Sequence, residues 1–466
     1  MTDSKKGKNK VGSSSAHNPV ARNSSGGLSE QLINEISDAK AEPSWMRDYR
    51  LMAYRVFKSS KLPEWVPSGA LNRLDFDKLN YFIRPVQGTS DKWEDLPDEI
   101  RQKYYKLGIP EVEQKFLAGL GAQLESEMVY HSIKADMEAK GVIFLTTSEA
   151  IIEYPDLVRK YFGKLVSPEN NMFAALNAAI WSGGSFIYIP PGVYITSPLH
   201  NFFQMETPSQ GQFERTIIVV DKGSSLEFIE GCVAPLYSDV SLHSGVVEIF
   251  VEDEAKVKFS TMQNWSKNVL NLVTKKAIVG NGASVEWIDG NVGSGLTMKY
   301  PTVRLEGKSA RAKIKSLAFA GSNQIIDAGA KVFHNAPDTK SVVEARSLLR
   351  KGGRSTFRGE VTISENAADS QSRVECISLL MEGGCRADTY PVLNIENPMS
   401  QVEHESSVIR IREEQLRYLR SRGFTEEASR GIIVGGFIES FTEALPLEYS
   451  VEFSRLIDIE IGDGSK

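Results

Sequence analysis

A strand–turn–strand pattern that returns at regular intervals constrains the fold of this chain more than any other feature. From Ser185 onward, alternating apolar and polar residues are interrupted by tight turns rich in glycine, aspartate and asparagine. Ala255, Ala283 and Ala310 occupy equivalent places in successive units, 28 and 27 residues apart. One such unit cannot bury both faces of its strands, whereas stacked units can. The pattern predicts a β-helix, a form of β-solenoid, with an irregular antiparallel sandwich as the alternative.

The chain divides into four parts by composition. Residues 1–28 are polar and rich in glycine and serine, which predicts a disordered tail. Residues 29–165 carry apolar side chains at three-to-four spacing, most strongly over residues 116–134, and predict an N-terminal helical domain. We expect the β-helix core over residues 166–405 and a C-terminal helical domain over residues 406–466. The predicted fold class is α+β, with a central right-handed β-helix between helical parts.

The C-terminal part has clear helix boundaries. A helix with a basic last turn is expected to end at Gly423, and Thr425 can cap the helix that follows. That second helix is apolar around much of its surface and has too few residues to form a core of its own. It therefore either covers the end of the solenoid or docks onto another protein.

Composition excludes several classes of function. The chain has 466 residues, 41% of them hydrophobic, which is enough for a large core. A net charge of −6 argues against broad nucleic-acid binding. Its 3 cysteines cannot form a disulfide framework, and neither a long apolar span nor a signal peptide is evident. We therefore expect a soluble cytoplasmic protein.

Residues that could bind a metal gather near the end of the predicted solenoid. Cys376 and Cys385 lie there, and the run Glu403, His404, Glu405 follows. Thiolate, imidazole and carboxylate are common ligands of transition metals, and thiolate favours iron–sulfur chemistry or zinc. The chain contains no C-x-x-C pair, so a self-sufficient cluster or zinc cage is not expected. Ligands this sparse suggest a metal held weakly, transiently or with help from a second chain.

Alternation along a strand would separate these candidates. Glu375 and Cys376 would face opposite ways, and Glu403 and Glu405 would share the side that His404 does not face. Cys376 could also be a small buried hydrophobe, as most free cysteines are. The acidic run could equally be a solvated edge. Position alone leaves both alternatives open.

A second group of candidates lies upstream, in the solenoid interior. If inward side chains of successive turns line up, Cys232, Gln263, Trp265 and Lys275 could line one internal channel. A buried lysine beside a thiol would lower the pKa of that thiol. The alternative is ordinary interior packing, with Lys275 pointing to solvent.

The motifs of several enzyme classes are missing. Gly307–Ser309 resembles the end of a phosphate-binding loop, but Thr302 stands where the first glycine should be, so we expect no ATP hydrolysis. Neither a G-x-S-x-G elbow nor an H-E-x-x-H run occurs. His334 is expected to stabilise a turn, and His131 to be a packed or capping residue of a helix.

Four separate motifs resemble a known family. They are K-A-E-P-S-W-M-R-D-Y-R near Lys40, V-E-C-I-S-L-L, C-R-A-D-T-Y-P and Q-V-E-H-E. They are similar to SufB scaffold sequences of the SufB/SufD family, from the SUF iron–sulfur assembly system, over all but the N-terminal tail. The resemblance implies that the protein is a scaffold rather than an enzyme. Such a scaffold would carry a transient 4Fe–4S or 2Fe–2S cluster, and reduced flavin is a further cofactor that the family allows.

The resemblance also implies roles for individual residues. Cys376 would be the cluster-assembly thiol and Glu405 a cluster ligand, with Glu403 and His404 as further candidates. Cys385 follows Gly383 and Gly384 at a predicted turn, and from that position we expect it to be structural or dispensable. Cys232 would accept persulfide sulfur, which would pass Gln263, Trp265 and Lys275. The family often carries a Y-F-R-I-N-like segment where this chain has Gln204 and Glu206, so a positive charge is lost at that end.

The implied partners are other proteins. They are a SufC-like ABC ATPase on the C-terminal helices, a SufD-like subunit or second copy of this chain beside the Cys376 strand, a sulfur donor and cluster acceptors. The main alternative is a SufD-like adaptor that binds the ATPase without carrying a cluster. A carbohydrate-active β-helix enzyme is a third class, but the clustered acidic residues and secretion signal that it needs are not evident.

Overall fold

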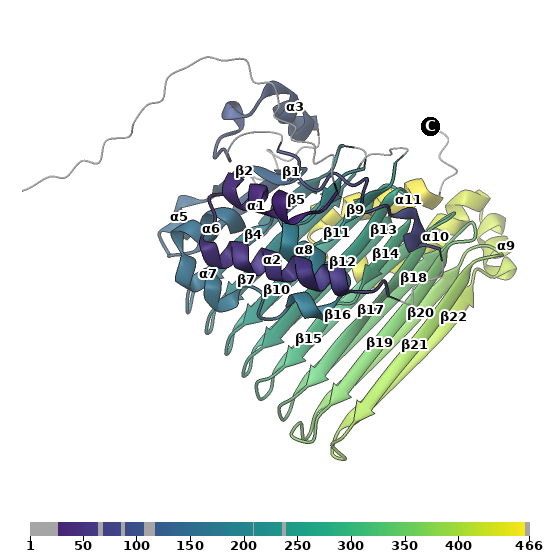
Figure 1. Ribbon diagram of the computed structural model, residues 1–466. Helices are drawn as coiled ribbons and strands as arrows, with labels where there is room; N and C mark the ends of the chain where they lie inside the picture. The colour runs from purple at the N-terminus through teal and green to yellow at the C-terminus, as the bar shows by residue number, and fades with distance from the viewer. Residues whose placement is uncertain are drawn as a thin grey trace, which may run out of the picture.

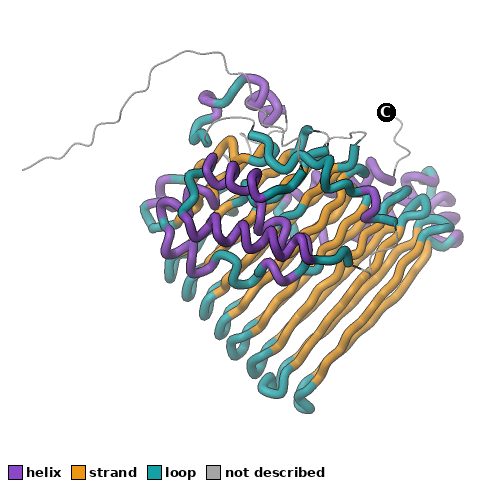
Figure 2. The backbone as a smooth tube through the Cα atoms, viewed as in Figure 1, coloured by secondary structure: helices purple, strands orange, loops and turns teal. Residues whose placement is uncertain are grey.

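The computed structural model describes residues 27–63, 69–84, 89–106, 117–207, 209–234 and 239–461. It forms a β-solenoid of about eight turns with helices packed on its sides (Figures 1 and 2). The predicted disordered tail lies outside the described residues, except for Gly27 and Leu28. Within the described ranges, no helix is long and apolar enough to cross a membrane.

Two sheets run along the solenoid. Within the described chain, sheet 1 has ten strands in the order β2-β1-β5-β8-β11-β13-β16-β18-β20-β22, and sheet 2 has twelve. The strands of sheet 1 are β1 (Gly119–Leu124), β2 (Glu127–Ile133), β5 (Leu199–Gln204), β8 (Ser225–Val233), β11 (Lys256–Trp265), β13 (Ser284–Gly293), β16 (Arg311–Ala320), β18 (Lys340–Leu349), β20 (Gln371–Leu380) and β22 (Gln401–Arg410).

The strands of sheet 2 are β3 (Ile143–Thr146), β4 (Ser185–Ile189), β6 (Gly211–Gln212), β7 (Arg215–Val220), β9 (Ser241–His243), β10 (Val246–Val251), β12 (Val269–Val279), β14 (Leu296–Lys299), β15 (Thr302–Leu305), β17 (Ile325–His334), β19 (Arg354–Ile363) and β21 (Arg386–Ile395). Only the β1–β2 and β3–β4 pairs are antiparallel among the described strand pairs. Parallel pairing elsewhere confirms the solenoid and excludes the antiparallel sandwich.

The repeated alanines close the turns as the sequence pattern predicts. Ala255, Ala283 and Ala310 are fully buried, and each immediately precedes the first residue of a strand of sheet 1. The residue before each of them, Glu254, Gly282 or Ser309, has a positive φ of 59–61°. This left-handed residue reverses the chain, and the small side chain that follows fits the crowded interior. The inner faces of both sheets form one continuous apolar core.

Helices cover the outer face of sheet 2. The first are α1 (Glu30–Ala39) and α2 (Ser44–Ser59), and α2 packs against α8 (Met172–Ile180), which lies on β12. Shorter elements are η1 (Leu71–Arg73), η2 (Trp93–Asp95), α3 (Asp98–Lys106), α5 (Ala135–Glu138), α6 (Thr147–Glu153), α7 (Pro155–Tyr161) and η3 (Pro168–Asn170).

The prediction of a helix over residues 116–134 is wrong. Residues 119–133 form the hairpin β1–β2, and β1 extends sheet 1 by pairing with β5. All six residues of β1 are buried, so the strand lacks the period-two alternation that would have identified it. His131 therefore lies on a strand, where its ring packs edge-on against Phe144 at 4.4 Å between centroids. Burial lowers the pKa of His131 to about 4.

The C-terminal helices cover the outer face of sheet 1. They are α9 (Glu413–Ser421), α10 (Glu426–Thr442) and α11 (Leu447–Ile461). Gly423 has a φ of 96°, and the Thr425 hydroxyl accepts from the Ala428 N–H, so both predicted boundaries are confirmed. Apolar residues of α10 and α11 pack on β11, β13, β16 and β18. The last strand runs to Arg410, so helix begins a few residues later than residue 406.

Candidate functional site

Cys376 lies inside the last turn of the solenoid. It is on the inner face of β20, is 2% exposed, and is paired in register with Ala345 on one side and Ser406 on the other. Its Sγ is 3.9 Å from Thr389 Oγ1 on β21, and Ser406 Oγ donates to the same hydroxyl at 3.0 Å. The last strands of both sheets therefore meet at this thiol.

The surroundings of Cys376 favour the neutral thiol. Burial raises the pKa of Cys376 to about 11, and the hydrogen bond from Thr389 and the charge of Arg346 oppose this shift only in part. The thiolate is the form that binds metal and attacks sulfur. Cys376 must lose its proton before it can act as a ligand. A nearby cation, entry of water or displacement of a neighbouring strand would favour that loss.

The Glu-His-Glu run alternates as predicted. Glu405 pairs with Glu375 and His404 with Val374, so the two carboxylates lie on the outer face and His404 on the inner face that Cys376 shares. His404 is half-buried, and its buried Nε2 has no hydrogen-bond partner. The structure thus brings His404, but not Glu405 or Glu403, to the face of the Cys376 thiol. Within the described ranges, no group of three or more His, Cys, Asp or Glu side chains could hold a metal.

Among the described residues, none covers the end of the solenoid next to Cys376. β22 is the last strand of sheet 1 and β21 the last of sheet 2. Large apolar side chains are exposed there at 43–63%: Tyr390, Val392, Leu393, Ile395, Met399, Val408 and Ile409. An exposed edge rich in apolar residues is a ready surface for pairing with another chain.

The upstream candidates also meet in the interior. Gln263 on β11 pairs in register with Cys232 on β8, and Cys232 packs in one apolar cluster with Trp265. Lys275 is 1% exposed and hydrogen-bonds the Glu230 carboxylate at 2.6 Å. Lys275 thus lies inside the solenoid, as the channel interpretation predicts, and does not point to solvent.

The predicted lowering of the Cys232 pKa is wrong in its net direction. Burial raises that pKa well above the usual value, and the charges of Glu230 and Glu214 raise it further. Lys275 and Lys299 act in the opposite direction but do not outweigh burial. Lys275 is paired with Glu230, and the negative charge of that carboxylate opposes the effect of Lys275 on the pKa of Cys232.

Several interior residues escaped the sequence analysis. The ammonium of Lys299 donates to Gln263 Oε1 at 3.0 Å and to Asp289 Oδ1 at 2.5 Å. Asn271 links Gln263 to His243, whose Nε2 is 2.5 Å from Glu214 Oε1. The sequence could have identified them, because each is a charged, imidazole or amide residue in a strand at a position where apolar residues are usual.

Strand register aligns the two regions. One inward column of sheet 1 runs through Asn201, Glu230, Thr261, Asp289, Ser316, Ala345, Cys376 and Ser406. The column beside it includes Phe203, Cys232, Gln263 and Asn291. Small and polar side chains therefore connect the surroundings of Cys232 with the thiol of Cys376.

The region of Gln204 and Glu206 is acidic. Gln204 Nε2 donates to Glu206 Oε1 at 2.6 Å, and the Glu206 N–H donates to Glu125 Oε1 at 3.1 Å. Burial raises the pKa of Glu125, which favours its neutral form. Elsewhere, His334 hydrogen-bonds Thr339 at 2.8 Å, as expected of a histidine at a turn. Cys385 lies half-buried just before β21.

Comparison with known proteins identifies relatives over nearly the whole chain. Residues 202–437 match the family described as "SUF system FeS cluster assembly, SufBD core domain", and residues 101–200 match the "SufBD protein N-terminal region". The chain is 47% identical over 435 residues to an iron–sulfur cluster assembly SufBD family protein of Staphylococcus epidermidis. Identity to the iron–sulfur cluster assembly protein SufB of Bacillus subtilis is also 47% over 435 residues. Each alignment covers 93% of both proteins.

Proposed function

Because the chain belongs to the SufB/SufD family of SUF-system iron–sulfur cluster assembly proteins, we propose that it is the scaffold on which the cluster is built. The observation that carries this proposal is the position of Cys376. Its thiol is buried one strand from an uncovered solenoid end, in a column of small and polar side chains that begins beside Cys232. A SufD-like adaptor would need neither the thiol nor the column.

Sulfur enters this scheme at Cys232. Its thiolate attacks the terminal sulfur of a persulfide on a donor protein, which forms a new sulfur–sulfur bond at Cys232. The donor leaves as a thiolate and takes up the proton that Cys232 lost. Because burial favours the neutral thiol of Cys232, docking of the donor must admit water or a base to this site.

The inner column then leads sulfur toward Cys376. Gln263 and Lys299 offer hydrogen-bond donors to an anionic sulfur species, and Trp265 closes one side with an apolar wall. Lys275 and Glu230 hold each other in place. The persulfide sulfur is released as sulfide only when two electrons break its sulfur–sulfur bond and return the cysteine to a thiolate; the reduced flavin that the family implies, or another two-electron donor, would supply them. Iron and sulfide are cargo that combine at Cys376, and thiolate ligation suits both cluster types.

Partner proteins complete the scheme. A SufD-like subunit or a second copy of this chain covers β21 and β22, and a SufC-like ATPase docks on the exposed side of α9–α11. Exposed apolar residues there include Phe424 and Ile432. Cys376 and Glu405 lie on opposite faces of sheet 1, so they share a cluster only if closure of the ATPase moves the last strands. Reduced flavin remains an expectation without assigned residues.

The test is anaerobic co-expression with the ATPase and partner subunit, followed by visible absorbance and iron and sulfide analysis. Wild type should give a brown complex with iron and sulfide in equal amounts. Cys376→Ala should give the same complex without colour, while the matched control Cys385→Ala keeps its cluster. A coloured Cys376→Ala complex would overturn the site, and a colourless wild type after reconstitution would favour the adaptor.

A further inference from the structure

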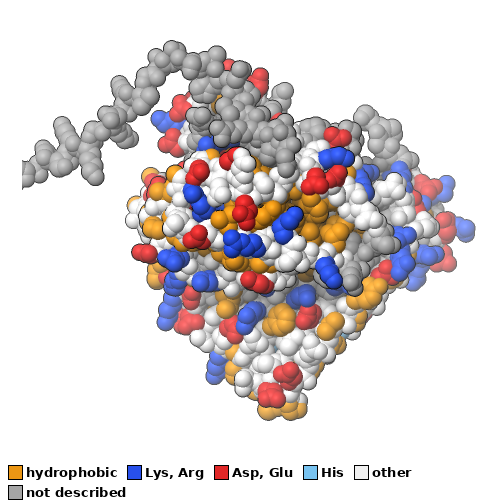
Figure 3. Space-filling model, in the orientation of Figure 1, with side chains coloured by type: hydrophobic (Ala, Val, Ile, Leu, Met, Phe, Trp, Pro, Cys, Tyr) orange, Lys and Arg blue, Asp and Glu red, His pale blue; other side chains and the backbone are white. Residues whose placement is uncertain are grey.

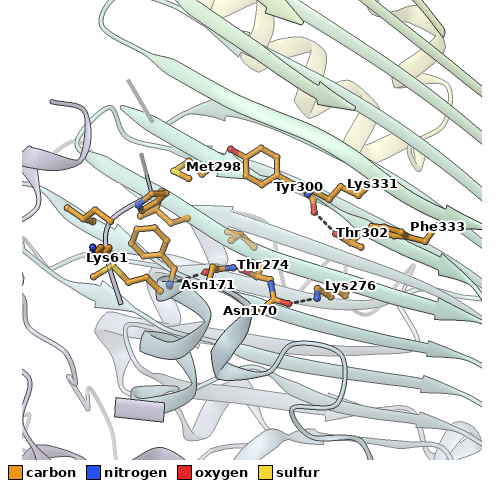
Figure 4. A pocket seen from close by; sticks show the side chains of 16 residues that line it. Lys61, Asn170, Asn171, Thr274, Lys276, Met298, Tyr300, Thr302, Lys331 and Phe333 are labelled. Carbon is orange, nitrogen blue, oxygen red and sulfur yellow. Dashed lines mark hydrogen bonds between the residues drawn. The ribbon is translucent and has the colours of Figure 1, made fainter. Parts of the chain in front are cut away.

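A cavity of about 650 Å³ lies on the outer face of sheet 2, apart from both cysteine sites (Figure 4). One wall is formed by residues 61–63 after α2 and by the start of α8, and the other by β12, β14, β15 and β17. Figure 3 views the molecule from this side, where hydrophobic side chains gather around the N-terminal helices. The volume is typical of sites that bind small molecules.

The charged side chains that line this cavity are all positive. They are Lys61, Lys276 and Lys331, and no carboxylate is found among its described lining residues. Lys331 forms an ion pair with Glu360, which lies outside the cavity lining, at 2.7 Å between Nζ and Oε2. Lys276 hydrogen-bonds the neutral side chain of Asn170. The cavity therefore carries positive charge that its own walls do not neutralise.

The nearest register partner of Lys276 cannot supply a free negative charge. Glu248 pairs with Lys276 across β10 and β12, but its carboxylate accepts from the Arg215 guanidinium at 2.8 Å. It also accepts backbone N–H groups of Gly163, Leu165 and Val166. Burial lowers the pKa of Lys276 and repulsion from Arg304 and Lys331 lowers it further, while the charge of Glu248 acts in the opposite direction without reversing the shift. An anion beside Lys276 would relieve this repulsion.

The rest of the lining is largely apolar. Figure 4 places Met298 and Tyr300 along one side of the cavity and Lys276 with Asn170 along another. Phe173 and Phe333 add aromatic surface. The start of α8 is not the anion site, because Asn171 Oδ1 already accepts from the N–H groups of Phe173 and Ala174 at 3.0 and 2.9 Å.

We propose that this cavity binds a small organic anion that carries a flat aromatic ring. The anionic group lies at Lys276, and the ring packs against Met298 and Tyr300. The proposal does not rest on cluster assembly: Thr274 and Lys276 flank Lys275, and Met298 and Tyr300 flank Lys299, but these cavity residues lie on the outer face of sheet 2 and the two interior lysines on the inner face.

Two matched probes test the proposal by calorimetry on the full chain. 1-Naphthalenesulfonate should bind about tenfold more tightly than the neutral 1-naphthalenemethanol, because only the anion forms an ion pair with the Lys276 ammonium. Lys276→Gln should abolish this preference, and Lys276→Arg should retain most of it. Lys258→Gln is the control, since Lys258 lies on the outer face of sheet 1 and pairs with Glu227 at 2.9 Å.

Three outcomes would overturn the proposal. Equal affinity for sulfonate and alcohol would show an apolar cleft without anion selectivity. Full sulfonate binding by Lys276→Gln would place the probe elsewhere, for example on the exposed end of the solenoid. An equal loss in Lys276→Arg, with unchanged circular dichroism, would show that the positive charge at this position does not matter.

Discussion

At the scale of single residues, the direction of a side chain decides more than its place in the sequence. Cys376 and Glu405 sit on adjacent strands, yet the thiol faces the interior and the carboxylate faces solvent. His404 shares the inner face with Cys376 and has an Nε2 without a hydrogen-bond partner. The sequence predicts Cys376, His404 and Glu405 as one group of candidate ligands, but the fold divides them between the inner and outer faces of sheet 1.

The reactivity of Cys376 should reflect its raised pKa. Alkylation of Cys376 by iodoacetamide should be slow at neutral pH and still rise about tenfold per unit between about pH 8 and pH 10, because only thiolate reacts. Peptide mass spectrometry follows Cys385 in the same sample as an internal comparison. A Cys376 rate that levels off near pH 8 would show that burial does not hold its proton.

At the scale of elements, buried charges fasten the N-terminal half to sheet 2. Arg215 on β7 and Glu248 on β10 are both fully buried and form an ion pair at 2.8 Å. The same carboxylate accepts the backbone N–H groups of Gly163, Leu165 and Val166 between α7 and η3. This network orients the segment that leads into α8 and, with it, one wall of the cavity around Lys276.

Removing one member of this pair should be costly. Arg215→Met leaves the Glu248 charge buried without its cation and should lower the free energy of unfolding by about 3–5 kcal/mol. Urea denaturation measures the change. Arg304→Met is the matched control, because its pairing with Glu306 is solvent-exposed and contributes about 0–1 kcal/mol. Equal losses in both variants would contradict the role of the buried pair.

At the scale of the whole molecule, the two ends of the solenoid differ. At the N-terminal end the sheets finish in the antiparallel pairs β1–β2 and β3–β4, whereas at the other end they finish in the parallel strands β22 and β21 (Figure 1). Apolar residues are exposed on those last strands. The C-terminal helices lie on the side of sheet 1 and leave this end open. One open end favours a single pairing surface rather than an unlimited stack.

Charge on the open end should block pairing without unfolding the chain. Leu393→Glu, at a position 46% exposed, should prevent assembly with the second β-helix subunit or with another copy. Light scattering after size-exclusion chromatography reads the mass of the complex. Tyr194→Glu, at 64% exposure elsewhere on the solenoid, should assemble normally. Assembly of Leu393→Glu would exclude this end as the pairing surface.

The sequence by itself determined the periodic part of this protein. The recurring turn alanines, the alternation in Glu403–Glu405 and the boundary at Gly423 and Thr425 all follow from local geometry, and each is found in the structure. The same reasoning failed for β1, because a strand buried on both faces loses its alternation.

Only the tertiary structure decided which charges meet. Stacking of the strands joins Lys299 to Gln263 and Asp289, and Lys275 to Glu230, although the partners lie 10 to 45 residues apart in the sequence. It also set the net pKa shift of Cys232, since burial depends on the whole fold and outweighs the neighbouring lysines. Local patterns fix turns and faces, whereas desolvation and interior pairing depend on contacts between distant turns of the solenoid.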